Sequence, residues 1–250
     1  MSKLVGFSIK MQNVKTRILV EVNVYNEGLK IRQTLSKFPP DAPYDVVVVD
    51  DGSTDDSPEY IKEFKYPVIR HEVNLGVGKA IKDAIEYGQK NDYEILVVMA
   101  GNGKMQPCDI PKLLEPILTE DYDYVQGSRY LTEGRKDNLP LFRDIMIRIF
   151  TWLVSITTRF KGTDVTCGFR AYKLRIFDDP RVNIRQHWLD RYEVEYYIHY
   201  KVLTLKYRVR EVPVGMIYPK EKRNYSKIKP FSGWWSMVKP WIFLPLKIKE

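Results

Sequence analysis

The sequence predicts an α/β fold in which helices flank a mostly parallel sheet. Through the first 130 residues, short apolar segments typical of strands alternate with segments in which apolar residues recur at helical spacing. One expected strand, residues 44–50, contains four consecutive valines, as strands do when both faces of a parallel sheet are covered. The chain has 250 residues, 44% of them hydrophobic, so it can bury one sizeable core or two small ones.

The first half of the chain is expected to alternate strands with helices. The strands are expected at residues 18–24, 44–50, 66–71, 95–99 and 122–126. The helices between them are expected at residues 26–38, 55–64, 76–89 and 109–118, the second capped by Thr54 or Asp55. The second half is expected to contain a long amphipathic helix at 141–160, an extended segment at 168–172, a helix at 188–205 and a strand at 207–214.

Composition excludes several classes of protein. Aromatic residues make up 13% of the chain, which is too many for a disordered low-complexity segment. The two cysteines, Cys108 and Cys167, cannot hold a disulfide scaffold of this size, and they fit a reducing compartment. The N-terminus lacks the long apolar segment of a signal peptide, and no stretch reaches the roughly 18 uncharged apolar residues of a membrane-spanning helix.

The charge of the chain indicates the kind of partner to expect. The formal net charge of +8 favours an anionic partner, which can be nucleic acid, a phosphorylated substrate or an anionic membrane. Charge is the only feature that suggests nucleic acid, since the sequence has no recognisable motif that reads it. We therefore expect no nucleic-acid partner.

Polar residues follow the expected strands at the edge where their carboxyl ends meet. Residues 49–53 read Val-Asp-Asp-Gly-Ser, which places Asp50 and Asp51 at the end of a buried strand. Open α/β sheets bind ligands there, and a carboxylate can accept hydrogen bonds from a nucleobase N–H or from ribose hydroxyls. The same segment fits an Asp-Gly turn that caps the next helix, so both interpretations stay open.

Three further segments place polar or glycine residues in similar positions. Residues 74–80 read Asn-Leu-Gly-Val-Gly-Lys-Ala between a strand and a helix, which suits either an anion at the helix N-terminus or close packing of the helix on the sheet. Arg129 follows the fifth strand, where it either binds a phosphate or faces solvent. Asp164 and Arg170 flank a glycine and an aromatic residue, which indicates a lined cleft.

Taken in order, these segments resemble the inverting family 2 glycosyltransferases, which have the GT-A fold. The resemblance covers about residues 17–230 and is nearest to the dolichyl- or polyprenyl-phosphate sugar synthases. It rests on residues 24–27, 50–53, 74–80, 99–107, 127–130, 164–170, 211–214 and 225–227. It implies one GT-A domain at 1–230, with a nucleotide-binding half at about 17–130 and an acceptor half at about 131–230, and a basic aromatic tail at 231–250.

The resemblance also implies roles for single residues in the nucleotide-binding half. Tyr25 and Glu27 match positions that border the nucleobase. Asp50 and Asp51 match a pair of which at least one member contacts the base or the ribose. Arg129 matches an arginine directed at the diphosphate.

A loop near the end of the likeness carries one more expected donor contact. Lys227 matches the lysine of a mobile loop that closes over the donor phosphates and excludes water from the site. The lipid-phosphate synthases carry an arginine six residues earlier, where this chain has Glu221 between Lys220 and Lys222, so a neighbouring cation would have to serve. Asn23 replaces the usual proline of the first motif.

The end of the fourth strand departs most from the family pattern. The family places two aspartates there to hold Mg²⁺ or Mn²⁺ on the diphosphate, whereas this chain has Ala100 and Asn102. We therefore predict no metal ligand and no required cofactor, any Mg²⁺ or Mn²⁺ being weakly bound, and we count Asn102 among the donor-binding residues. Lys104, on the same loop, is expected to neutralise part of the leaving diphosphate.

Several carboxylates could act as the base that activates the acceptor. Inverting transfer to a sugar hydroxyl needs such a base, whereas a phosphate acceptor is already anionic. The available groups are Asp164, Asp190, Glu193 and Glu195. The spacing of Glu193 and Glu195 on a helix lets at most one of them face the cleft. The candidate catalytic residues are Asp164, Glu195, Arg170 and Lys104.

Two segments with amphipathic composition indicate a membrane surface. The helix at 141–160 mixes apolar residues with arginines, and residues 231–244 set three tryptophans beside a lysine, which is typical of interfacial segments. The alternatives for the tail are packing on the domain's own core and an oligomer contact. We expect amphipathic interfacial helices in this C-terminal part of the chain.

The predicted protein is a peripheral enzyme on the cytoplasmic, inner face of the cell membrane. It is expected to move a sugar, with inversion, from a UDP- or GDP-linked donor to a polyprenyl-phosphate or other lipid-linked acceptor. One alternative is a glycosyltransferase that acts on a surface polysaccharide or glycan. The other is a catalytically inactive protein that binds nucleotide sugars.

Overall fold

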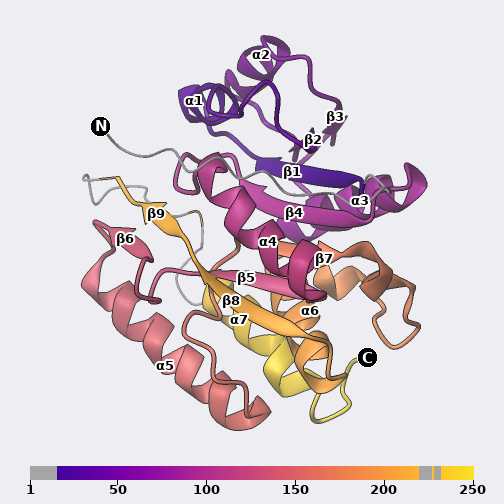
Figure 1. Ribbon diagram of the computed structural model, residues 1–250, viewed down its shortest axis with the longest axis vertical. Helices are drawn as coiled ribbons and strands as arrows, with labels where there is room; N and C mark the ends of the chain where they lie inside the picture. Colours follow the sequence, from indigo (N-terminus) through magenta and orange to yellow (C-terminus); the bar gives the residue numbers. More distant parts are fainter. Residues whose placement is uncertain (1–15, 220–226, 228–231) are drawn as a thin grey trace.

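The computed structural model describes residues 16–219, 227 and 232–250, and it is built on a seven-stranded sheet (Figure 1). The strands are β1 (Ile18–Val24), β2 (Asp45–Asp50), β3 (Val68–Arg70), β4 (Ile95–Ala100), β5 (Tyr124–Ser128), β7 (Arg170–Lys173) and β8 (Val209–Pro213). Their order in the sheet is β3-β2-β1-β4-β7-β5-β8. Neighbours are parallel except that β7 runs antiparallel to β4 and to β5. The expected mostly parallel α/β sheet is confirmed.

Each face of the sheet carries an apolar layer, because side chains along a strand alternate between its two faces. In β1, Val20 and Val22 join one core cluster and Leu19 joins the other. The first cluster includes residues of α1 (Leu29–Leu35), α2 (Ser57–Lys62) and α4 (Ile110–Glu120). The second includes residues of α3 (Val77–Lys90) and α6 (Glu193–Thr204).

Two further helices, α5 (Leu141–Thr158) and α7 (Ser232–Phe243), lie at the end of the molecule opposite α1 and α2 (Figure 1). A third apolar cluster joins Phe150 of α5, Tyr196 of α6 and Met237 of α7. The described part of the tail therefore packs on the domain, as one of its two alternatives expected. None of the helices in the described part of the chain is both long enough and apolar enough to cross a bilayer.

One buried acidic residue interrupts the apolar pattern of β1. Glu21 lies on the same face as Leu19, is fully buried, and its carboxylate accepts no hydrogen bond from the described residues. In register, Glu21 stands opposite Val98 of β4, and Val98 stands opposite Arg170 of β7. Burial, followed by the charge of Glu195, raises the pKa of Glu21 well above its ordinary value.

The structure differs from the expected elements in the second half of the chain. The helix expected at 188–205 is a 3-10 turn, His187–Leu189, followed by α6 from Glu193, because residues 189–191 run against the start of α3 instead. Two short strands that were not expected, β6 (Arg135–Asp137) and β9 (Gly215–Ile217), pair in parallel as a second sheet. The remaining 3-10 turns are Pro107–Asp109 and Leu174–Asp178.

Candidate active site

Three loops meet at the carboxyl ends of β1, β2 and β4 and form the floor of the candidate site. The backbone N–H of Asp51 donates to the carbonyl of Val24 at 2.8 Å, and the N–H of Gly101 donates to the carbonyl of Asn23 at 2.8 Å. A Cβ atom on Gly101 would lie 2.7 Å from Ile31 Cδ1 and 3.0 Å from the carbonyl oxygen of Asn23, so a side chain there would require its neighbours to shift. The sequence thus brings together the segments in which Tyr25, Asp50 and Asn102 were expected to act.

The carboxylate of Asp51 is engaged in hydrogen bonds within the protein. Its carboxylate accepts hydrogen bonds at 2.8 Å from the backbone N–H groups of Leu75 and Gly76 and from the side-chain amide of Asn74. His71 lies 2.7 Å away through Nδ1. Asp51 therefore holds the loop before α3 in place.

Asp50 differs from Asp51 because one of its carboxylate oxygens accepts no hydrogen bond from the described residues. Its Oδ1 accepts the N–H of Ser53 at 2.9 Å. Its Oδ2 accepts no hydrogen bond from the described residues, and the nearest cation is the guanidinium of Arg70 at 3.5 Å. Of the two candidate carboxylates, Asp50 is the one whose geometry suits a nucleobase or ribose hydrogen bond.

The glycines at 76 and 78 allow α3 to approach another segment closely. A Cβ atom would lie 2.4 Å from the carbonyl oxygen of Asp190 at Gly76, and 2.0 Å from that of Leu189 at Gly78. The backbone N–H of Lys79 donates to the same Asp190 carbonyl at 3.0 Å. Close packing, one of the two interpretations of this segment, is therefore the one that the structure supports.

Lys227 lies against the loop that follows β1. Its ammonium donates to Glu27 Oε1 at 2.7 Å and to the carbonyl of Asn26 at 3.0 Å, and it also contacts the carbonyl of Tyr25. The same nitrogen lies 5.4 Å from the centre of the Tyr25 ring. The structure thus brings together three residues that the resemblance placed around the donor. Lys220, Glu221 and Lys222 lie outside the described residues.

Arg129 and Asp164 form a buried ion pair beside this crevice. Arg129 Nε lies 2.6 Å from Asp164 Oδ2, and a terminal nitrogen lies 2.7 Å from Oδ1. The guanidinium also donates to Thr166 Oγ1 at 2.7 Å and to the hydroxyl of Tyr218. Burial by itself would lower the pKa of Arg129, but the charge and hydrogen bonds of Asp164 raise it well above its ordinary value. This geometry favours positioning roles for both residues over the diphosphate contact and the base expected of them.

A row of polar side chains holds the loop that contains Asp164. Arg170 of β7, Gln126 of β5 and Glu211 of β8 stand in register across three neighbouring strands. Together they bind backbone groups of residues 163–167: Arg170 donates to two carbonyls, Gln126 donates to one, and Glu211 accepts two N–H groups. Arg170 is fully buried, so its role in this structure is to position the loop.

Of the acidic residues near α6, Glu195 is the one without a lysine partner among the described residues. Asp190 pairs with Lys82, and Glu193 pairs with Lys239 of α7 at 2.7 Å. The Glu195 carboxylate accepts no hydrogen bond from the described part of the chain and lies where a Cβ atom on Gly168 would come within 2.8 Å of Oε1. Burial raises the pKa of Glu195, and the charge of Arg170 opposes that rise. Glu195 thus remains a candidate base.

The loop after β4 does not fit a tightly held divalent cation. Ala100 offers no side-chain ligand, and Asn102 Oδ1 already accepts the N–H of Lys104 at 3.2 Å. No group of three acidic, histidine or cysteine residues suited to a metal occurs among residues 16–219, 227 and 232–250. A hard cation such as Mg²⁺ depends on charged oxygen ligands, so the residues present supply too few.

Lys104 occupies the same loop, half-buried, and is tied to β9 because its carbonyl accepts the N–H of Ile217 at 3.0 Å. Its ammonium lies 5.5 Å from the centre of the Tyr218 ring. Burial and, next, the charge of Arg143 lower the pKa of Lys104 to about 8. Sequence analysis missed Tyr218 and Arg143, because no motif marks them and β9, which leads to Tyr218, was not expected.

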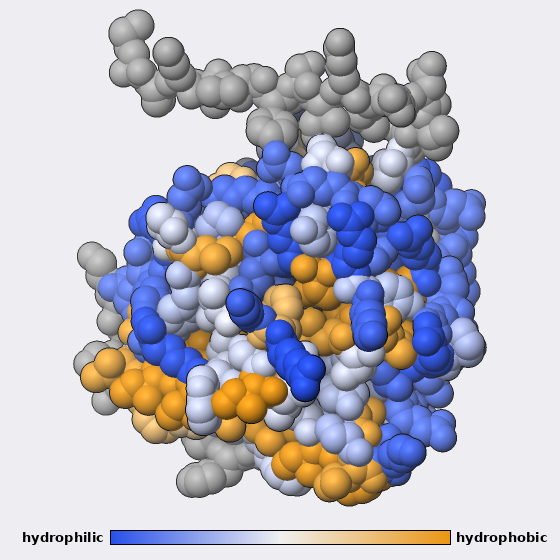
Figure 2. All heavy atoms as spheres, turned by 60° about the horizontal axis from the view of Figure 1, so that its bottom comes forward, coloured by the Kyte–Doolittle hydropathy of each residue, from blue (hydrophilic) through white to orange (hydrophobic). Residues whose placement is uncertain are grey.

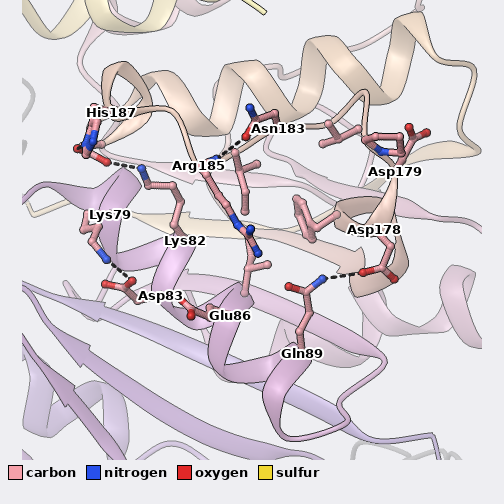
Figure 3. Close-up of a pocket in the computed structure, with 16 residues that line it drawn as sticks. Lys79, Lys82, Asp83, Glu86, Gln89, Asp178, Asp179, Asn183, Arg185 and His187 are labelled. Atoms are coloured by element: carbon pink, nitrogen blue, oxygen red, sulfur yellow. Dashed lines mark hydrogen bonds and ion pairs between the residues drawn. The ribbon is translucent and has the colours of Figure 1, made fainter.

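A second hollow runs along α3, with a volume of about 460 Å³ (Figure 3). Its polar side chains bind one another: Lys79 pairs with Asp83, and the Gln89 amide donates a hydrogen bond to Asp178. Asp190, one of the four carboxylates considered as a base, lines it but pairs with Lys82, and none of the residues expected to bind the donor does so. The crevice at the strand ends therefore remains the candidate active site.

Comparison with known proteins agrees with this fold. The family model described as glycosyl transferase family 2 matches residues 20–179. An uncharacterised protein of Methanocaldococcus jannaschii is 32% identical over 206 residues, which cover 82% of this chain and 83% of the relative. The undecaprenyl-phosphate mannosyltransferase of Micrococcus luteus is 28% identical, over 80% of this chain and 84% of its own length.

A solved structure shows the same fold at lower identity. Glucosyl-3-phosphoglycerate synthase from Mycobacterium tuberculosis, crystallised with Mg²⁺ and uridine diphosphate, superposes with a TM-score of 0.66 at 17% identity. The match covers 93% of this chain and 79% of the synthase. The family match spans more than half of the chain and agrees with the GT-A-like sheet, so the protein belongs to glycosyl transferase family 2 and is a glycosyltransferase.

Proposed function

We propose that this glycosyltransferase moves a sugar from a nucleoside-diphosphate sugar to a polyprenyl-phosphate or other lipid-linked acceptor at the cytoplasmic face of the membrane. The acceptor oxygen forms a bond to the anomeric carbon while the bond from that carbon to the diphosphate breaks, and its electron pair stays on the diphosphate oxygen. Attack opposite the leaving group inverts the anomeric centre. A phosphate monoester needs no protein base for this step, because it is already anionic near neutral pH.

The observation that carries the proposal is the exposed apolar face of α5. Leu141 is 73% exposed, Phe142 70% and Trp152 61%. The exposed apolar residues of this helix are Leu141, Phe142, Ile145, Ile149, Trp152, Leu153 and Ile156. Their spacing of three and four places them along one side of the helix. An apolar stripe of this length is unusual on a soluble monomer and suits a lipid surface.

The position of α5 connects that surface to the candidate site. Arg143, in the first turn of the helix, lies 5.9 Å from the centre of the Tyr218 ring, which also faces Lys104. Asp144 accepts a hydrogen bond at 2.7 Å from the hydroxyl of Tyr130, the residue that follows Arg129 in the chain. Figure 2, which brings the α5 and α7 end of Figure 1 forward, shows apolar patches among hydrophilic and neutral surface. An acceptor phosphate at headgroup depth would be near the crevice.

The relatives support the same acceptor class. The Micrococcus luteus relative is named for transfer of mannose to undecaprenyl phosphate. The chain covers most of that relative's length, so the likeness extends beyond the nucleotide-binding half. The choice of sugar and of nucleotide does not follow from it.

One observation favours the alternative, transfer to a hydroxyl of a glycan. The Glu195 carboxylate accepts no hydrogen bond from the described residues, and its raised pKa suits a group that takes up a proton. A base of this kind is needed for a hydroxyl acceptor and superfluous for a phosphate.

The experiment that tests the proposal is a transfer assay with a panel of radiolabelled UDP- and GDP-sugars. Each donor is incubated with the purified protein and either liposomes containing polyprenyl phosphate or soluble oligosaccharides. Label in the lipid phase, reduced in an Asp50→Asn variant, is the expected result. Label in the oligosaccharide alone would establish the glycan alternative. Binding of donor with no transfer to any acceptor would indicate an inactive nucleotide-sugar-binding protein.

A further inference from the structure

Basic side chains from four separate segments gather where the loop after β4 lacks acidic residues. Lys104 comes from that loop, Arg143 from the start of α5, Lys30 from α1, and Lys227 from the segment near the tail. Each of the other three lies near enough for its charge to lower the pKa of Lys104, and Glu27 acts in the opposite direction. The rings of Tyr25 and Tyr218 lie beside Lys227 and Lys104 at 5.4 and 5.5 Å.

Such a cluster favours an anionic ligand. Like charges held near one another repel, and a half-buried ammonium also loses hydration, so the cationic form of Lys104 is disfavoured in the ligand-free protein. A multiply charged anion would reverse both effects, since it attracts every cation of the cluster at once. The cluster is therefore arranged for a ligand with several negative charges in a small volume.

The sheet order places this cluster on the diphosphate side of the crevice. Because β1 lies between β2 and β4, the loops follow one another as 50–53, 25–27 and 100–104. A nucleoside bonded to Asp50 Oδ2 at one end of this row would direct its phosphates past Glu27 toward Lys104. The loop at residues 100–104 offers a divalent cation no charged ligand.

We propose that Lys104, with Arg143 and Lys227, does the work of a divalent metal by binding the diphosphate of the donor. The inference rests on the proposed nucleoside-diphosphate donor. When the bond between the anomeric carbon and the diphosphate oxygen breaks, the electron pair remains on that oxygen, and the ammonium groups stabilise the added charge. No proton needs to move, and donor binding requires no metal.

The test measures nucleotide affinity by calorimetry, in EDTA and in Mn²⁺. The ligands are UDP, GDP and the corresponding monophosphates. Lys104→Met removes the charge and keeps most of the side-chain length, Lys104→Arg restores the charge, and Lys90→Met is the matched control. Lys90 pairs with Glu86 on the far end of α3 and lies outside the site. Circular dichroism verifies that each variant is folded.

The wild type is expected to bind its diphosphate with affinities in EDTA and in Mn²⁺ that agree within about twofold. Lys104→Met should weaken diphosphate binding by about tenfold or more, which is the scale of a charge-assisted hydrogen bond, and should weaken monophosphate binding much less. Lys104→Arg should recover most of the loss, and Lys90→Met should bind like the wild type.

Two results would overturn the inference while leaving the proposed function intact. One is diphosphate binding that EDTA abolishes and Mn²⁺ restores, which would mean that other residues hold a metal. The other is unchanged diphosphate affinity in Lys104→Met together with a raised KM for polyprenyl phosphate, which would assign the cluster to the acceptor's phosphate. Failure of the wild type to bind any nucleotide would instead refute the proposed donor class, and the inference with it.

Discussion

Arg129 and Asp164 bind each other through two parallel hydrogen bonds, of 2.6 and 2.7 Å, although 35 residues separate them in the chain. Arg129 is 2% exposed and Asp164 is fully buried. A pair of this kind contributes little net free energy when intact, but removal of one partner leaves a buried charge without compensation. The pair thus fixes residues 163–167 against the end of β5.

The first prediction follows from this pair. Arg129→Met and Asp164→Leu, made singly, should each lower the free energy of unfolding by about 3–5 kcal/mol, because the remaining charge is buried and unpaired. The double variant should recover a large part of that loss. Urea denaturation of all four proteins gives the coupling energy. Losses that simply add in the double variant would show that the two residues act independently.

The second prediction separates Asp50 from Asp51. Asp50→Asn should weaken nucleotide binding by about tenfold, since a hydrogen bond to a charged group contributes about 1.5–3 kcal/mol, and it should change thermal stability little. Asp51→Asn should lower the free energy of unfolding by about 1–3 kcal/mol, because its amide group would face the N–H groups of Leu75 and Gly76. Calorimetry measures the nucleotide affinity of each variant, and thermal melts measure its stability. If Asp51→Asn weakened binding and Asp50→Asn lowered stability, the donor contact would belong to Asp51.

The third prediction concerns the apolar face of α5. Replacing Phe142 and Trp152 by serine should reduce co-sedimentation with anionic liposomes by about tenfold or more, because both side chains would otherwise bury apolar surface in the lipid. Nucleotide binding should be unaffected. Val68→Ser, on exposed β3, is the matched control and should bind liposomes like the wild type. Equal sedimentation of all three proteins would exclude α5 as the membrane contact.

The fourth prediction concerns pH and Glu21. Folding raises the pKa of this carboxyl, so the folded state retains a proton that the unfolded chain releases. The stabilising contribution is complete below the unfolded pKa of about 4.3 and declines as the pH rises toward the folded value. Glu21→Gln keeps the neutral form at every pH. Its free energy of unfolding should therefore exceed that of the wild type by a margin that grows from pH 4 to pH 8, and a constant margin would show that Glu21 does not titrate in this way.

The strands that form the crevice could be predicted from sequence nearly to the residue. The strand β4 and the four valines of β2 are continuous apolar runs, and β1 is apolar apart from Glu21 and Asn23, a pattern that few other structures accommodate. The strands β6 and β9 could not be predicted, because each has three residues and β6 consists of Arg-Lys-Asp. Such strands form only because neighbouring segments bring them together.

The candidate site was located by sequence more accurately than its residues were assigned roles. The end of a buried strand identifies Asp50 and Asp51 as candidates together. Which of the two carboxylates already accepts hydrogen bonds from the protein depends on the backbone of residues 74–76. Arg129 has a position typical of a phosphate ligand, but its guanidinium binds Asp164 instead. No local sequence pattern predicts that contact. Roles that depend on long-range partners require the structure.

The antiparallel strand β7 has a consequence for the order in which the protein can assemble. The strands β3, β2, β1 and β4 pair with one another within the first 100 residues, and only the edge of β4 is left for β7, so the proposed nucleotide side of the crevice can form early in synthesis. Strand β5 has no partner in that unit, since it pairs only with β7 and β8. It can pair only after Arg170–Lys173 has left the ribosome, and the buried ion pair of Arg129 and Asp164 can form only then as well. The proposed acceptor side therefore forms last, and a chain that stalls before β7 would expose β5 as an unpaired, aggregation-prone strand.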